Sequence, residues 1–80
     1  MSEQTVRVDR KELSSERVLE HLDAGKRVLV TIEALGVERS VVLRKTDGEY
    51  ICDTGLKLLS HDDRQAMKRC IEQLRLASRS

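Results

Sequence analysis

Aromatic side chains are almost absent from this chain, which has no Phe, no Trp and a single Tyr. Its hydrophobic core must therefore come from Val, Leu, Ile and Ala, and a Val, Leu or Ile side chain contributes roughly 1.5–3 kcal/mol when fully buried. The 80 residues suffice for one domain, 1–80, close to the lower size limit for folding on a core of its own. Because such a core leaves a thin margin of stability, we expect the protein to form a homodimer.

An excess of charge, a membrane segment and a disulfide framework are also missing. Fifteen basic residues accompany fourteen acidic ones, and the net charge of +1 creates no global field to attract DNA or an anionic membrane. There is no apolar run of about 18 residues and no apolar signal core at the N-terminus. Two cysteines cannot build the framework of a small secreted protein. These absences predict a soluble cytoplasmic protein with no membrane partner. Residues 1–4 resemble a frayed terminus, and we expect them to be disordered.

The stretch from Val28 to Cys52 predicts a three-stranded antiparallel meander. Apolar residues occupy every second position at its start, which is the pattern of a strand with one buried face. Asp47 and Gly48 form a residue pair typical of a two-residue type I′ hairpin turn, in which both positions have positive φ. The three expected strands are 28–34, 39–46 and 49–53.

The expected register sorts the residues of the meander onto two faces. The turn at Asp47-Gly48 pairs Lys45 with Tyr50, Leu43 with Cys52, and Val41 with Thr54. A turn at Leu35-Gly36 likewise pairs Val30 with Val41, and Val28 with Leu43. The predicted core face then consists of Val28, Val30, Ile32, Val41, Leu43, Tyr50 and Cys52. The opposite face brings together three apolar residues that we predict to form an interface: Leu29, Val42 and Ile51.

Two helices are predicted to flank the meander. The first begins after the N-cap Ser14 and extends for about ten residues to Gly25, which suits the left-handed position that follows a helix. The second covers 61–77, where Ser60 and Asp63 have the spacing of a capping box. Its apolar residues recur every three or four positions: Met67, Cys70, Ile71, Leu74 and Ala77.

These elements combine into an α+β fold. Thr5–Asp9 alternates between polar and apolar residues and is a candidate for an additional edge strand. We therefore expect an antiparallel meander of three or four strands, with both helices packed on one face.

Three residues with metal-ligating side chains, Cys52, His61 and Cys70, are each separated by nine positions. Structural zinc sites usually bring their ligands in close pairs such as C-x₂-C, and no such pair is present. Cys52 lies on the predicted core face and Cys70 on the apolar stripe of the second helix, which favours core packing over a metal site or a redox pair. No phosphate-binding Gly loop or oxyanion-hole Gly run is found. We expect no catalytic residue and no cofactor, with a Cys/His metal or thiol site as the less favoured alternative.

Four basic residues are spaced along one side of the predicted second helix: Arg64, Lys68, Arg75 and Arg79. Cations at this spacing could follow a row of phosphates, so a nucleic-acid-associated protein is the main alternative function. Glu72 interrupts the stripe, and no aromatic side chain is available for base stacking. A charged stripe opposite an apolar one is also what a solvated amphipathic helix shows, and this is the favoured interpretation.

One stretch of the sequence carries a resemblance: Tyr50–Thr54, together with His61, Met67, Cys70 and Ile71. In these residues the chain resembles a group of small uncharacterised proteins of halophilic archaea. The resemblance implies a cytoplasmic archaeal protein and carries over no activity and no binding residue.

No residue pattern identifies a ligand. The leading hypothesis is a non-catalytic interaction module that acts as a homodimer or as a small partner subunit. It depends on Leu29, Val42 and Ile51, which place an apolar patch on a face expected to meet solvent.

Overall fold

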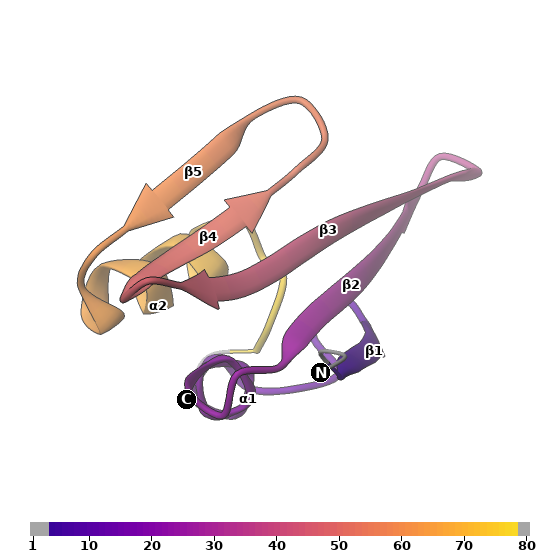
Figure 1. Ribbon diagram of the computed structural model, residues 1–80. Helices are drawn as coiled ribbons and strands as arrows, with labels where there is room; N and C mark the ends of the chain where they lie inside the picture. Colours follow the sequence, from indigo (N-terminus) through magenta and orange to yellow (C-terminus); the bar gives the residue numbers. More distant parts are fainter. Residues whose placement is uncertain (1–3, 79–80) are drawn as a thin grey trace.

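The computed structural model describes residues 4–78 and contains one sheet and two helices (Figure 1). The elements along the chain are β1 (Thr5–Asp9), α1 (Ser15–Asp23), β2 (Arg27–Ala34), β3 (Val37–Thr46), β4 (Glu49–Asp53), β5 (Leu58–His61) and α2 (Arg64–Gln73). The five strands lie in the order β1-β2-β3-β4-β5. The β1–β2 pair is parallel and the other pairs are antiparallel. Within the described residues, neither helix has the length and the apolar character needed to cross a membrane.

The central meander β2-β3-β4 confirms the predicted strands and most of the predicted register. The expected pairs are present: Val28–Leu43, Val30–Val41, Leu43–Cys52 and Lys45–Tyr50. Asp47 and Gly48 have φ values of 51° and 80°, as a type I′ turn requires. The predicted pairing of Val41 with Thr54 is wrong, because the β3–β4 ladder stops at Val42–Asp53 and the Thr54 amide bonds the carbonyl of Lys57 instead.

The first strand is present as predicted, but its direction makes the sheet mixed instead of antiparallel. Thr5 pairs with Arg27 and Asp9 with Thr31, in a parallel ladder. The reason is the crossover through α1, which returns the chain to the start of β2 and aligns it with β1. Of the residues expected to be disordered, 1–3 lie outside the described part of the chain, and the Gln4 carbonyl accepts a hydrogen bond from the Arg27 amide.

A fifth strand replaces the start of the predicted second helix. Ser60 pairs with Ile51 and His61 with Tyr50, so the capping box assigned to Ser60 and Asp63 is wrong. Asp63 is the N-cap, and its side chain accepts a hydrogen bond from the Gln65 amide at 3.3 Å. The predicted start of this helix was wrong because Ser60 and Asp63 are both good N-cap residues. In the structure, Asp63 caps the helix.

The first helix begins and ends as predicted. The Ser14 side chain caps it by accepting from the Arg17 amide at 3.2 Å. Gly25 follows its C-cap with a φ of 82°. The Gly25 amide bonds the Leu22 carbonyl and the Lys26 amide bonds the His21 carbonyl, which is the Schellman arrangement.

The hydrophobic core lies between the two helices and the inner face of the sheet. Val18, Leu19 and Leu22 of α1 and Met67 and Ile71 of α2 are fully buried there. They pack against the inner residues of the sheet and of the C-terminal tail: Val8, Val28, Val30, Val41, Leu43, Tyr50, Cys52, Leu76 and Ala77. Both helices therefore cover the same face, as predicted, and the outer face of the sheet has no helix on it.

The tail after α2 is tied to the segment between β1 and α1. The Lys11 amide donates to the Leu76 carbonyl at 3.0 Å, and the Ser15 amide donates to the Ser78 carbonyl at 2.8 Å. In return, the Ser78 amide donates to the Leu13 carbonyl at 3.0 Å. The last described residues are thus held against the N-terminal part of the chain.

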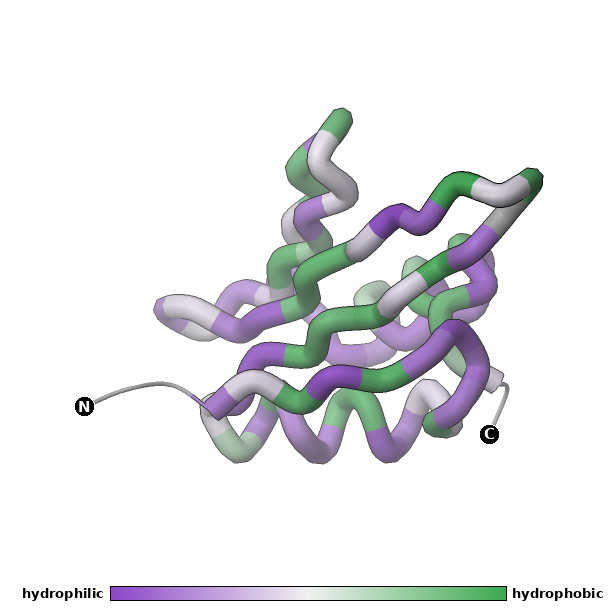
Figure 2. Tube along the Cα trace, turned by 90° about the vertical axis from the view of Figure 1, so that its right-hand side faces the viewer, coloured by the Kyte–Doolittle hydropathy of each residue, from purple (hydrophilic) through white to green (hydrophobic). Residues whose placement is uncertain are grey.

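Two hairpin ends project from the body of the molecule and diverge from one another (Figures 1 and 2). One is the β2–β3 turn, where Leu35 is fully exposed and Val37 is 54% exposed. The other is the β4–β5 connection, where Leu56 is 82% exposed. Both ends are coloured as hydrophobic in Figure 2, so the protein also exposes apolar residues to solvent at its hairpin ends.

Candidate functional site

The uncovered outer face of the sheet carries an apolar centre. One row of side chains crosses all five strands on this face: Arg7, Leu29, Val42, Asp53 and Leu58. Ile51 lies one row further along and is a diagonal neighbour of Val42 and Leu58. The three predicted interface residues are partly buried by their neighbours, whereas Leu58 is 61% exposed. The structure thus brings Leu29, Val42 and Ile51 together and adds Leu58 to them.

Charges of opposite sign lie on either side of this apolar centre. Arg44 pairs with Ile51 on the side toward the β3–β4 turn. Glu33 and Glu38 pair with each other on the side toward the β2–β3 turn. Within residues 4–78, no ion pair involves Arg44, Glu33 or Glu38. Two carboxylates directly opposite one another repel, so this end of the face carries uncompensated negative charge.

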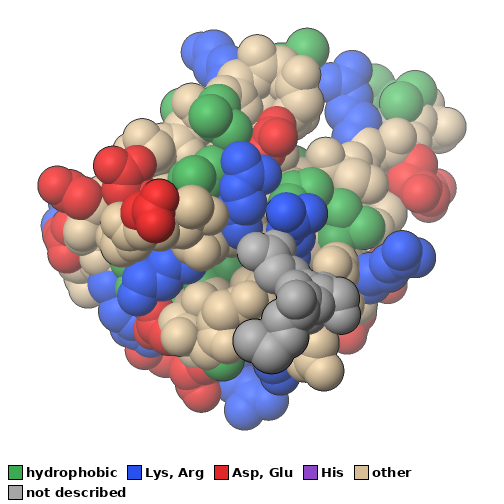
Figure 3. Space-filling view, viewed as in Figure 1, with side chains coloured by type: hydrophobic (Ala, Val, Ile, Leu, Met, Phe, Trp, Pro, Cys, Tyr) green, Lys and Arg blue, Asp and Glu red, His purple; other side chains and the backbone are tan. Residues whose placement is uncertain are grey.

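Hydrophobic side chains also reach the surface over the strands and hairpin turns in the upper half of Figure 3, where they lie beside Lys and Arg side chains.

The cysteines lie in the interior. Cys52 and Cys70 are both buried and unoxidised. Burial, and next the neighbouring Cys70 thiol, raise the pKa of Cys52 to about 12. Burial also raises the pKa of Cys70. Both thiols are therefore protonated at neutral pH, which makes them poor nucleophiles and poor metal ligands.

His61 lies opposite Tyr50 in the β4–β5 ladder. Its Nε2 atom is buried and has no hydrogen-bond partner among the residues that the structure describes. Among residues 4–78, no three His, Cys, Asp or Glu side chains lie close enough to hold a metal ion. The predicted candidates Cys52, His61 and Cys70 are therefore not assembled into a metal centre in this part of the chain.

The predicted basic stripe is divided between different environments. Arg64 bonds Glu16 at 2.8 Å and Asp23 at 2.9 Å, and Lys68 approaches Glu16 at 3.4 Å. These contacts join α2 to α1. Arg75 lies beyond the end of α2, and Arg79 lies outside the described residues.

Asp23, at the end of α1, is a polar junction that the sequence did not single out. Its carboxylate accepts from the Tyr50 hydroxyl at 2.6 Å and from Arg64 at 2.9 Å, and Lys45 lies 3.5 Å away. Burial raises the pKa of this carboxyl, but the hydrogen bonds from Tyr50 and Arg64 outweigh it and hold the pKa below its ordinary value. Through these contacts Asp23 links both helices to the sheet. Because its carboxylate is already bonded to Tyr50 and Arg64, we assign it a structural role.

Leu58 was missed because β5 was not predicted. The only sequence signal for it is Gly55, which follows the strand Glu49–Asp53 and has a φ of 84° in the turn. The turn at Gly55 reverses the chain after β4, and the apolar pair Leu58-Leu59 begins the strand that returns along it.

Comparisons with known proteins identify a family but no activity. The profile of a family of unknown function (DUF8001) matches residues 1–79. No curated protein and no solved structure matches the chain.

Proposed function

For a chain that belongs to this family of unknown function, we propose the role of a non-catalytic interaction module that forms a homodimer through the outer face of its sheet. The observation that carries the proposal is the uncovered apolar centre formed by Leu29, Val42, Ile51 and Leu58. Apolar side chains gathered on an uncovered sheet face are commonly covered by a partner. Asp53 lies between Val42 and Leu58 in the row, and its carboxylate accepts a hydrogen bond from the Gly55 amide at 2.9 Å. Burial of this centre removes the side chains from water and adds to the stability of a small aliphatic core.

The charges toward the two strand ends of this face, Arg44 at one and Glu33 with Glu38 at the other, favour a second copy as the partner. A two-fold axis running across the strands lays two copies of the sheet face to face with their strands antiparallel. The end that carries Arg44 then lies over the partner's end that carries Glu33 and Glu38. Each contact occurs twice, and each guanidinium approaches a carboxylate pair that has no cation within the described part of its own chain.

The nucleic-acid alternative ranks second because two of its residues are occupied. Arg64 and Lys68 would have to leave Glu16 before they could contact phosphates. A cytoplasmic location and the archaeal source implied by the resemblance also remain predictions.

The dimer is tested by measuring molar mass in solution with light scattering or sedimentation at micromolar concentration. Val42→Lys and Leu58→Lys each place a charge in the contact and are expected to shift the protein toward monomer. The matched control is Val37→Lys, an identical change on the same strand whose side chain belongs to the opposite face. A monomeric parent chain, or equal behaviour of all three variants, would overturn the proposed face.

A charge exchange tests the two-fold arrangement separately. Arg44→Glu alone is expected to weaken the dimer, because it brings a third carboxylate near Glu33 and Glu38. Adding Glu38→Arg to Arg44→Glu is expected to restore it. If the double variant is weaker than the single one, the two ends do not face each other and the antiparallel arrangement is wrong.

A further inference from the structure

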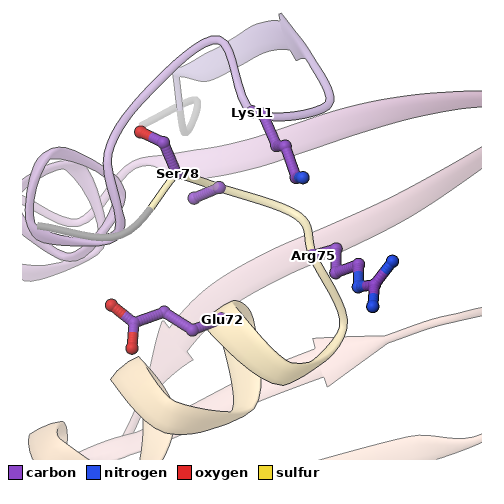
Figure 4. Close-up of a pocket in the computed structure, with 5 residues that line it drawn as sticks. Lys11, Glu72, Arg75 and Ser78 are labelled. Carbon is purple, nitrogen blue, oxygen red and sulfur yellow. The ribbon is translucent and has the colours of Figure 1, made fainter.

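A cleft of about 320 Å³ lies where the segment after β1, the end of α2 and the C-terminal tail meet (Figure 4). It is separate from the outer sheet face and is lined by Lys11, Glu72, Arg75, Ala77 and Ser78. Its volume is at the lower end of the range of small-molecule sites, which is about 300–1,000 Å³.

Two cationic side chains in the cleft, Lys11 and Arg75, form no ion pair within the described residues. Lys11 and Arg75 extend on the same side of the tail, whereas the Glu72 carboxylate points away from them toward α1 (Figure 4). The Ser15 hydroxyl holds this carboxylate with a 2.7 Å hydrogen bond.

Both cations occupy backbone positions that favour glycine. Lys11 has a φ of 65° and Arg75 a φ of 58°. Arg75 is the left-handed residue of a Schellman arrangement, since its amide bonds the Glu72 carbonyl and the Leu76 amide bonds the Ile71 carbonyl. At the matching position after α1, the same chain has Gly25.

Leu35 and Asp47 also have positive φ, but they lie in hairpin turns, whereas Lys11 and Arg75 line a cleft. A non-glycine residue in the left-handed region is strained, and such residues concentrate at binding and catalytic sites. Here two strained residues are both cationic, line the same cleft and lack an anionic partner in the described part of the chain.

We propose that this cleft binds a small phosphorylated molecule, whose phosphate group lies between Lys11 and Arg75. The planar guanidinium of Arg75 suits bidentate contact with phosphate oxygens, and the ammonium of Lys11 supplies a second positive charge. The remaining volume, beside Ala77 and Ser78, accommodates the organic part of the ligand.

The test is a titration followed by amide chemical shifts, with inorganic phosphate and adenosine monophosphate as separate probes at low salt. Saturable shifts are expected at residues 10–12 and 74–78. Lys11→Gly and Arg75→Gly are each expected to lower the affinity at least tenfold. Because glycine also relieves the left-handed backbone, both variants should fold at least as well as the parent, so lost binding cannot be attributed to misfolding.

The control is Lys57→Gln, which removes the same unit of charge from the exposed β4–β5 connection and should leave the affinity unchanged. Tighter binding of adenosine monophosphate than of phosphate identifies an organic phosphate as the ligand class, whereas equal binding limits the site to the phosphate group. Shifts that do not saturate, that scatter over all cationic surfaces, or that persist in both glycine variants would overturn the proposal.

Discussion

Replacing Arg75 with glycine separates the effect of its backbone conformation from the effect of its charge. In the folded protein, a non-glycine residue in the left-handed region costs roughly 1–2 kcal/mol. Glycine removes this cost, but its greater freedom in the unfolded chain offsets about 0.4–1 kcal/mol of the gain. Arg75→Gly should therefore raise the free energy of unfolding by roughly 0.5–1 kcal/mol, which corresponds to a rise in Tm of about 2–8 °C for a chain of this size.

The assay is thermal and urea unfolding followed by circular dichroism, at one fixed protein concentration because dimerisation would add to the apparent stability. Arg75→Ala is the reference variant, since it removes the guanidinium and keeps the strained backbone. The stability of the glycine variant relative to the alanine variant isolates the backbone term.

Gly25→Ala provides the reciprocal test at the end of α1. Apart from Gly25 itself and its two chain neighbours, no heavy atom of the described residues lies within 4 Å of the position that a Cβ would occupy at Gly25, so the substitution meets no steric obstacle there. The loss of stability should then come from the positive φ alone and be similar in size to the gain at Arg75. If Arg75→Gly is less stable than Arg75→Ala, the strain at Arg75 is not what the backbone angle implies.

Three further outcomes are expected from the fold. Gly48→Val should lower Tm clearly, because a β-branched residue is poorly tolerated at a φ of 80°; an unchanged melt would refute the turn assignment. Cys52 and Cys70 should react slowly with thiol reagents in the native protein and rapidly in denaturant, because both are buried and protonated; fast native labelling would contradict this. The pKa of Asp23 is held below its ordinary value of 3.8, so its ionised form stabilises the fold above that pH, and this contribution is lost as pH falls through the lower folded pKa. Asp23→Asn should reduce the loss of unfolding free energy that occurs when the pH is lowered below about 4. If the unfolding free energy of the variant falls with pH in parallel with that of the parent, the role assigned to Asp23 is wrong.

The parts of the fold that were predicted correctly depend on local signals. The Asp47-Gly48 turn determines the pairing of β3 with β4, and the alternation along β2 determines which residues face the core. The same register places the outer-face residues Leu29 and Val42 opposite each other, with Ile51 on the diagonal. Ser14 and Gly25 mark the ends of α1 for the same reason, since both act within a few residues.

The parts that were missed depend on contacts between distant segments. The direction of β1 follows from the crossover through α1 and cannot be read from the alternation in Thr5–Asp9. β5 exists because the exposed edge of β4 accepts it, and its four residues are too few to show a period. The cleft at Lys11 and Arg75 was invisible because neither residue type indicates a left-handed backbone.

The binding of the C-terminal tail also sets the order of events during synthesis. The hydrogen bond from the Ser78 hydroxyl to the Leu13 carbonyl joins residues 65 positions apart, and Leu76 and Ala77 are buried in the core beside much earlier segments. On the ribosome, all five strands emerge before Leu76 and Ala77, which complete the core against them. The nascent chain therefore leaves this part of its core open until the tail is released, and native packing is completed after translation has passed residue 78.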